Sequence, residues 1–197
     1  KKPVVAIVGE IFMRDNVFCN GRLIHKLEEL GGETVISPFH EWLTYSTYRY
    51  TRDSHWKNDY KGILKSKIQK YSQKITHHNL HKQVKSNINT DTEVHVEDML
   101  ELCNDYVHKD DDGDPPIAIG TAVNLAKKEV SGIVNILPFT CMPGTLITAL
   151  SNKFRKDHEN IPWVDVAYDG QDDISLDTRL QAFVHQAIEY GKVKGFI

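Results

Sequence analysis

Cys141 is the residue whose local sequence is best suited to chemistry. It lies in the segment 138–145, Pro-Phe-Thr-Cys-Met-Pro-Gly-Thr, where two prolines and a glycine predict a rigid turn between a strand and a helix. Thr145 is expected to cap that helix. The sulfur would then lie near the helix N-terminus, whose partial positive charge favours the thiolate needed by a metal, a cluster or nucleophilic chemistry. The alternative is a buried cysteine with a purely structural role.

The other two cysteines, Cys19 and Cys103, have weaker settings. Cys103 falls on the apolar stripe of a predicted helix, which favours a core position, and Cys19 lies in the loop after the first predicted strand, where a structural role is also favoured. No two of the three cysteines have CxxC spacing, so local spacing predicts no complete zinc or iron–sulfur site. An odd number of distant cysteines also argues against a disulfide framework and favours a reducing, cytoplasmic compartment.

Acidic and polar residues follow several of the predicted strands. Glu10 comes directly after the first strand and Asp169 directly after the fourth, and for both the choice between a functional role and ordinary helix or turn capping stays open. The loop residues Arg14, Asp15 and Asn16 are an anion-binding candidate. Neither a P-loop, a GxGxxG motif nor a GxSxG elbow occurs in the sequence.

The elements that must position these residues alternate between strands and helices. Continuous apolar runs predict strands at residues 4–9, 34–37, 132–138 and 163–168, and apolar residues at helical spacing between them predict helices. We therefore expect a single α/β domain over residues 1–197, with a four-stranded parallel sheet in the Rossmann-like or flavodoxin-like order 2-1-3-4. A helical insertion is predicted at about residues 50–130, between strands 2 and 3.

In such sheets, ligands bind beyond the carboxyl ends of the strands. That edge is expected to present six residues: Glu10, Glu41, Thr140, Cys141, Asp169 and Gln171. Within the insertion, one amphipathic helix is predicted from Trp56, Tyr60, Ile63, Leu64, Ile68, Tyr71 and Ile75.

The composition excludes two classes of partner. Lysine and arginine total 24 against 27 acidic residues, for a net charge of -3, so no basic excess points to nucleic acid. The longest apolar runs are too short to span a membrane, so no membrane partner is expected. The sequence enters a strand almost at once, at Val4, which predicts the absence of a signal peptide and suggests a piece of a longer protein.

A set of segments gives the sequence a family resemblance. They are Val-Gly-Glu-Ile at 8–11, Glu-Glu-Leu-Gly-Gly-Glu at 28–33, Ser-Pro at 37–38 with Glu-Trp at 41–42, Asn-Ile-Leu-Pro-Phe-Thr-Cys-Met-Pro-Gly-Thr at 135–145, Asp-His-Glu-Asn-Ile-Pro at 157–162 and Ala-Tyr-Asp-Gly-Gln at 167–171. Taken together, they resemble the dehydratase-like region of the large acyl-CoA dehydratase activase-related proteins. These proteins are relatives of the 2-hydroxyglutaryl-CoA dehydratase and benzoyl-CoA reductase subunits.

The resemblance implies a module of two Rossmann-like halves that hold a [4Fe-4S] cluster between them, with this chain as the second half. Cys141 matches the cysteine that the second half supplies after a central strand, and Glu10 and Thr140 would surround it as candidate catalytic residues. The other cluster ligands would come from the first half, so this chain alone is expected to hold no cluster. The implied partners are the remaining domains of the same longer protein, with an acyl-CoA or a dehydratase subunit as further candidates.

Two functions follow from these observations. In the first, the chain is part of an iron–sulfur redox protein in which an ATP-driven activator reduces the cluster for acyl-CoA dehydration, and the isolated chain is inactive. In the second, it is a docking or regulatory domain that keeps the fold without the reaction.

Overall fold

The chain folds into two compact units. The computed structural model describes residues 1–84, 95–171 and 174–197. One unit, here called the sheet unit, comprises Lys1–Ser37 and Glu97–Ile197, and the other, the helical unit, comprises Pro38–Val96. The helical unit thus begins before the predicted insertion and ends well before residue 130, and residues 85–94 of that insertion lie outside the described part of the chain.

The sheet has the predicted class and strand order. Four strands, β1 (Val4–Gly9), β2 (Glu33–Ile36), β3 (Gly132–Pro138) and β4 (Trp163–Tyr168), form one sheet in the order β2-β1-β3-β4. All three pairings are parallel. The two central strands are buried along nearly their whole length, which explains their unbroken apolar sequences, whereas the edge strand β2 alternates between exposed and half-buried residues.

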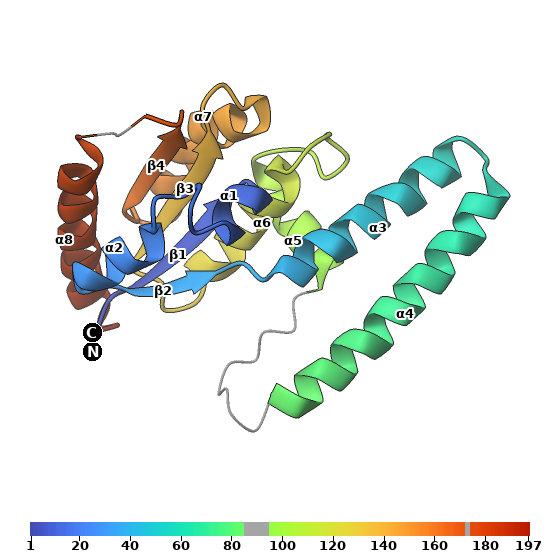
Figure 1. Ribbon diagram of the computed structural model, residues 1–197, viewed down its shortest axis with the longest axis horizontal. Coiled ribbons are helices and arrows are strands. Elements are labelled where there is room, and N and C mark those ends of the chain that lie inside the picture. Colours follow the sequence, from blue (N-terminus) through green and yellow to red (C-terminus); the bar gives the residue numbers. More distant parts are fainter. Residues whose placement is uncertain (85–94, 172–173) are drawn as a thin grey trace. The chain divides into compact units, whose positions relative to one another are not determined.

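Helices connect the strands and cover both faces of the sheet (Figure 1). The described helices of the sheet unit are α1 (Ile11–Asp15), α2 (Leu23–Glu29), α5 (Val96–Leu102, of which Val96 belongs to the helical unit), the 3-10 turn η1 (Cys103–Asp105), α6 (Pro115–Ala126), α7 (Met142–Asp157) and α8 (Leu176–Lys194). The acidic run at 110–114 precedes α6 as a turn, with Pro115 and Pro116 in the first helical positions, where proline is favourable.

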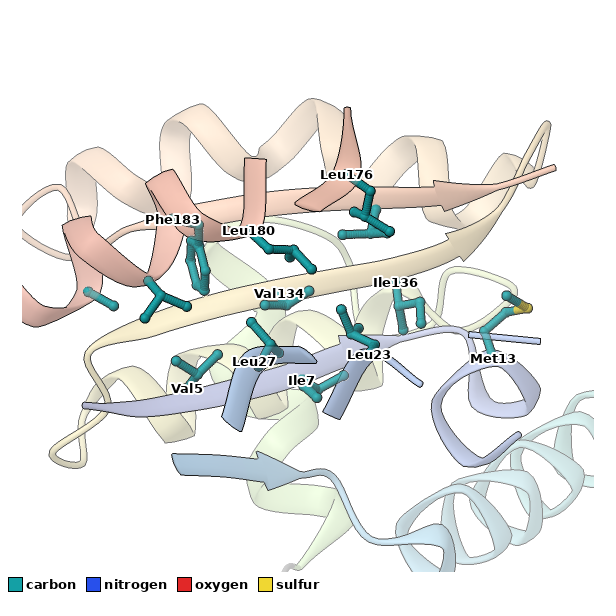
Figure 2. Close-up of a cluster of buried hydrophobic side chains, with 13 residues drawn as sticks. Val5, Ile7, Met13, Leu23, Leu27, Val134, Ile136, Leu176, Leu180 and Phe183 are labelled. Carbon is teal, nitrogen blue, oxygen red and sulfur yellow. The ribbon is translucent and has the colours of Figure 1, made fainter. Parts of the chain in front are cut away.

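An apolar cluster lies between the sheet and helices α2 and α8 (Figure 2). Val134 and Ile136 of β3 contribute to it from the sheet, Leu27 from α2, and Leu180 and Phe183 from α8. Burial of each such side chain contributes roughly 1.5–3 kcal/mol, so this layer is a main source of stability for the sheet unit.

Helix α7 lies close against the strand that precedes it. A Cβ atom on Gly144 would stand 2.6 Å from Cβ of Leu137 in β3, so only glycine permits this approach. The glycine in the segment 138–145 therefore serves helix–strand packing, and it brings the first turn of α7, with Cys141 before it, onto the end of the central strand.

The helical unit contains α3 (Phe39–Trp56) and α4 (Tyr60–Val84), which run antiparallel beside each other (Figure 1). A helix is found at the predicted place as α4, but Trp56 belongs to the end of α3, and the apolar side chains of the prediction are mostly exposed and do not form the buried face of the helix. Among the described residues, no helix combines the length and apolar composition that crossing a bilayer requires.

Candidate functional site at the carboxyl edge of the sheet

The end of β1 is shaped by Gly9 and Glu10. Gly9 has φ +111°, a conformation that side-chain-bearing residues rarely adopt, and it turns the chain from the strand into α1. The Glu10 carboxylate then accepts hydrogen bonds from the backbone N–H groups of Phe12 (3.1 Å) and Met13 (2.8 Å). Glu10 is therefore the N-cap of α1, and both of its carboxylate oxygens accept helix N–H groups.

Cys141 lies at the end of the neighbouring central strand, where it is the N-cap residue of α7. Its N–H donates to the Pro138 carbonyl (3.1 Å), and its side chain is half-buried. The prediction that Thr145 caps this helix is wrong. Thr145 lies within the helix, and its hydroxyl donates to the Cys141 carbonyl at 2.8 Å. A threonine hydroxyl can either accept from an N–H as a helix cap or donate to the carbonyl four residues earlier. The position of Thr145 in the sequence is compatible with both roles.

Thr140 precedes the cysteine in a left-handed conformation, with φ +63°. Such a conformation is uncommon for a β-branched residue and is kept only where the surrounding turn imposes it. The Thr140 hydroxyl donates to the Phe139 carbonyl at 2.6 Å, and the residue is exposed. The left-handed conformation of Thr140 reverses the chain between the end of β3 and the start of α7, where Cys141 is the N-cap residue.

Large apolar side chains border this edge and are exposed. Phe139 and Met142 flank Thr140 and Cys141 in sequence, with 64% and 80% of their surface exposed, and Phe12, in the helix that follows the adjacent strand β1, is 58% exposed. We call these three residues the apolar rim. Exposed aromatic and methionine side chains of this size around one edge are typical of a surface that a partner covers.

The other two cysteines have different surroundings from those of Cys141. Cys103 is fully buried, as predicted, and its thiol donates to the Leu100 carbonyl at 3.1 Å. Burial raises the pKa of the Cys103 thiol to about 11, which keeps it protonated at neutral pH. Cys19 packs against the apolar cluster under α2 and α8. Within the described part of the chain, no three histidine, cysteine or acidic side chains are grouped as a metal site would require.

The remaining sequence candidates take ordinary structural positions. The Asp169 carboxylate accepts from the N–H of Gln171 (2.9 Å) in an exposed turn. Glu41 is buried within the helical unit, in the first turn of α3. Arg14 lies in α1, not in a loop, and is buried, while the amide oxygen of Asn16, which follows α1, accepts from the Cys19 N–H (3.0 Å), so these residues do not present their polar groups to solvent as one set.

A cleft of about 690 Å³ opens on the α2 and α8 side of the same edge. Met13 and Leu176 give it apolar walls, and Cys19 lines it as well. On its border, Lys26 and Asp177 form an ion pair at 2.7 Å. This cleft could not be predicted from local patterns, because its walls come from segments more than 140 residues apart.

A partly buried polar network under α7 was also missed by sequence reasoning. One carboxylate oxygen of Asp165 accepts from Asn135 (2.7 Å), the Thr148 hydroxyl (3.0 Å) and the indole N–H of Trp163 (3.1 Å). The strand register places Asn135 beside Asp165. A polar residue within each of two otherwise apolar strands was the available signal, since buried polar groups need partners.

Comparison of the chain with protein-family models, with curated proteins and with solved structures finds no match.

Proposed function

We propose that this chain is one lobe of an iron–sulfur redox protein related to the 2-hydroxyacyl-CoA dehydratases, and that Cys141 supplies one ligand to a [4Fe-4S] cluster shared with another lobe. The observation that carries this proposal is the position of Cys141, half-buried at the N-terminus of α7 and at the end of a central strand, with the exposed apolar rim around it. A cysteine at this place would lie at the edge that a second lobe would cover.

The residues present fit one ligand rather than a complete site. Clusters of this type are held by several thiolates, and the chain has three cysteines, of which Cys103 is buried and protonated and Cys19 lies on the cleft side. The partner lobe would therefore have to supply most of the ligands. Such a cluster, when bound, accepts and passes on a single electron at low potential.

The residues of this chain would then have positioning roles. Thr140, held in its left-handed conformation, fixes the direction in which Cys141 leaves the strand. Glu10 holds α1 in place through its two hydrogen bonds to backbone N–H groups. The apolar rim of Phe12, Phe139 and Met142 would exclude water from the cluster once a second lobe covers it.

Iron and sulfide analysis tests this proposal. The longest natural protein that contains these residues is purified without oxygen, and the Cys141→Ser variant is compared with Cys19→Ser, whose cysteine has a similar exposure. We expect Cys141→Ser to lose most of the iron and of the visible absorption of the cluster, and Cys19→Ser to keep both. If Cys141→Ser keeps its full iron content and its reduction behaviour, the proposal is wrong.

The second candidate is a docking domain without a cluster, and the apolar rim is the observation that favours it. An exposed apolar surface at the edge suits a protein partner whether or not a cluster lies beneath it. In that case the wild-type protein contains no iron, while Phe139→Ser and Met142→Ser still weaken association with the partner lobe.

A further inference from the structure

Five large apolar side chains of α4 lie together on an exposed face of the helix. Tyr60, Leu64, Ile68, Tyr71 and Ile75 are between 44% and 80% exposed. We call these five residues the α4 strip. Five side chains of this size expose on the order of 500 Å² of apolar surface, near the upper end of what single soluble proteins leave uncovered.

The opposite face of α4, which packs on α3, carries small and polar side chains. Gly62 and Ser66 are buried there, and a Cβ atom on Gly62 would stand 2.5 Å from the Ser54 hydroxyl oxygen of α3. Further along, Gln73 donates to the Leu43 carbonyl at 3.3 Å. The α3–α4 pair is therefore held by close approach of the two helices, and the apolar side chains of the strip take no part in it.

The spacing of the strip indicates which kind of surface it fits. The pattern repeats after eleven residues, from Tyr60 to Tyr71, so the strip runs almost straight along the helix for about 22 Å and covers an arc of about 80°. Leu64, Ile68, Tyr71 and Ile75 also have the 4-3-4 spacing of a heptad seam, but this seam covers only about two heptads, because its next positions are Lys61 and His78. The strip therefore fits one helix laid along it and is too short for a long coiled coil.

The charge on α4 restricts the partner further. The helix contains no acidic residue, and lysines border the strip on both sides, with Lys61 and Lys65 on one side and Lys67 and Lys74 on the other. A second copy of this chain, packed strip against strip, would bring lysines against lysines. A bilayer surface is also disfavoured, because the strip is narrow and lysines border it directly, whereas helices that lie on membranes present a broad apolar face opposite a polar one.

We propose that the α4 strip binds a helix of a partner protein that carries an apolar ridge bordered by glutamate or aspartate. The buried area would lie at the lower end of the range for contacts between domains, which implies a modest affinity that depends on salt. This proposal does not rest on the role of Cys141, because it involves only the helical unit.

A designed peptide provides the test. It is a helical peptide of about 22 residues with leucines at the spacing of the α4 strip and glutamates on both borders, and a matched peptide has lysines in place of the glutamates. Binding to the whole chain is measured by fluorescence anisotropy. We expect the glutamate peptide to bind, and Ile68→Ser to weaken binding at least about tenfold without loss of helicity. The control, Val193→Ser, removes an even more exposed apolar side chain from α8 and should leave binding unchanged.

Charge reversal tests the border residues. The double variant Lys67→Glu, Lys74→Glu should lose the glutamate peptide and bind the lysine peptide instead, whereas Lys128→Glu, an exposed lysine outside α4, should change neither. The proposal is overturned if the glutamate peptide does not bind, or if the lysine peptide binds the unaltered chain equally well. Two further outcomes would overturn it: binding of the chain to vesicles containing phosphatidylserine, or self-association of the chain. Either would count if Ile68→Ser abolishes it and the glutamate peptide does not inhibit it.

Discussion

Replacement of Gly9 by alanine should be among the most damaging single changes in the sheet unit. Gly9 has φ +111°, and a Cβ atom there would stand 2.7 Å from the Asn135 amide oxygen, 2.8 Å from the Ile136 nitrogen and closer still to the Ile136 carbonyl oxygen. Two of these three atoms belong to the backbone of β3, so rotation of a side chain cannot relieve the overlap. The same carbonyl also accepts the N–H of Glu10 at 2.9 Å.

The expected cost has two parts. The backbone conformation alone costs about 1–3 kcal/mol for a residue with a side chain. Separation of β1 from β3 by enough to admit the methyl group, with weakening of the Glu10 hydrogen bond, adds about 2 kcal/mol. We therefore expect Gly9→Ala to lower the free energy of unfolding of the sheet unit by about 4 kcal/mol.

Gly31→Ala is the matched control. Gly31 also has a positive φ, +98°, but no atom lies within 4 Å of the position that its Cβ would take. Only the conformational cost should remain, at about 1–3 kcal/mol.

The two variants are compared by urea unfolding, followed by tryptophan fluorescence. Phenylalanine replaces Trp42 and Trp56 of the helical unit in every protein tested, so that Trp163 alone reports on the sheet unit. A difference of about 2 kcal/mol corresponds to roughly 1 M in the urea midpoint. If Gly9→Ala unfolds within about 1 kcal/mol of Gly31→Ala, the close approach of β1 and β3 at this point does not limit stability and the reasoning fails.

Three further predictions concern thiols, pH and the polar network. In the native chain a thiol reagent should modify Cys141 before Cys103, because Cys103 is fully buried and its pKa is raised to about 11, and the reverse order in mass spectrometry would contradict both assignments. Burial lowers the pKa of His158 below that of the unfolded chain, so its contribution to stability is full above about pH 6.5 and is lost as the pH falls below that value. Urea midpoints at pH 7.5 and 5.5 should therefore fall less in His158→Gln than in the unaltered chain, and an equal fall would exclude this role. Asp165→Ala should destabilise the sheet unit by about 2–4 kcal/mol, since it leaves three donors without their shared acceptor, while Asp169→Ala in an exposed turn should cost under about 1 kcal/mol in the same assay.

Much of the fold could be predicted because its causes are local. Continuous apolar runs occur where a strand is covered on both faces, and the alternation of strands with helices leaves few parallel topologies. Strand order and the ends of β1, β3 and β4 followed from these patterns. The position of Cys141 before a helix also followed, since the prolines and the glycine beside it restrict the turn directly.

The features that the tertiary structure decided depend on which side of an element meets which neighbour. The spacing of apolar residues in α4 predicted an amphipathic helix, but only packing determined that Gly62 and Ser66 face α3 while Ile68 is exposed. A periodic pattern states that two faces differ and does not state which face is covered. Likewise, Asn135 and Asp165 could be seen as polar residues in apolar strands, but their contact depends on the register of β3 with β4, which no local segment contains.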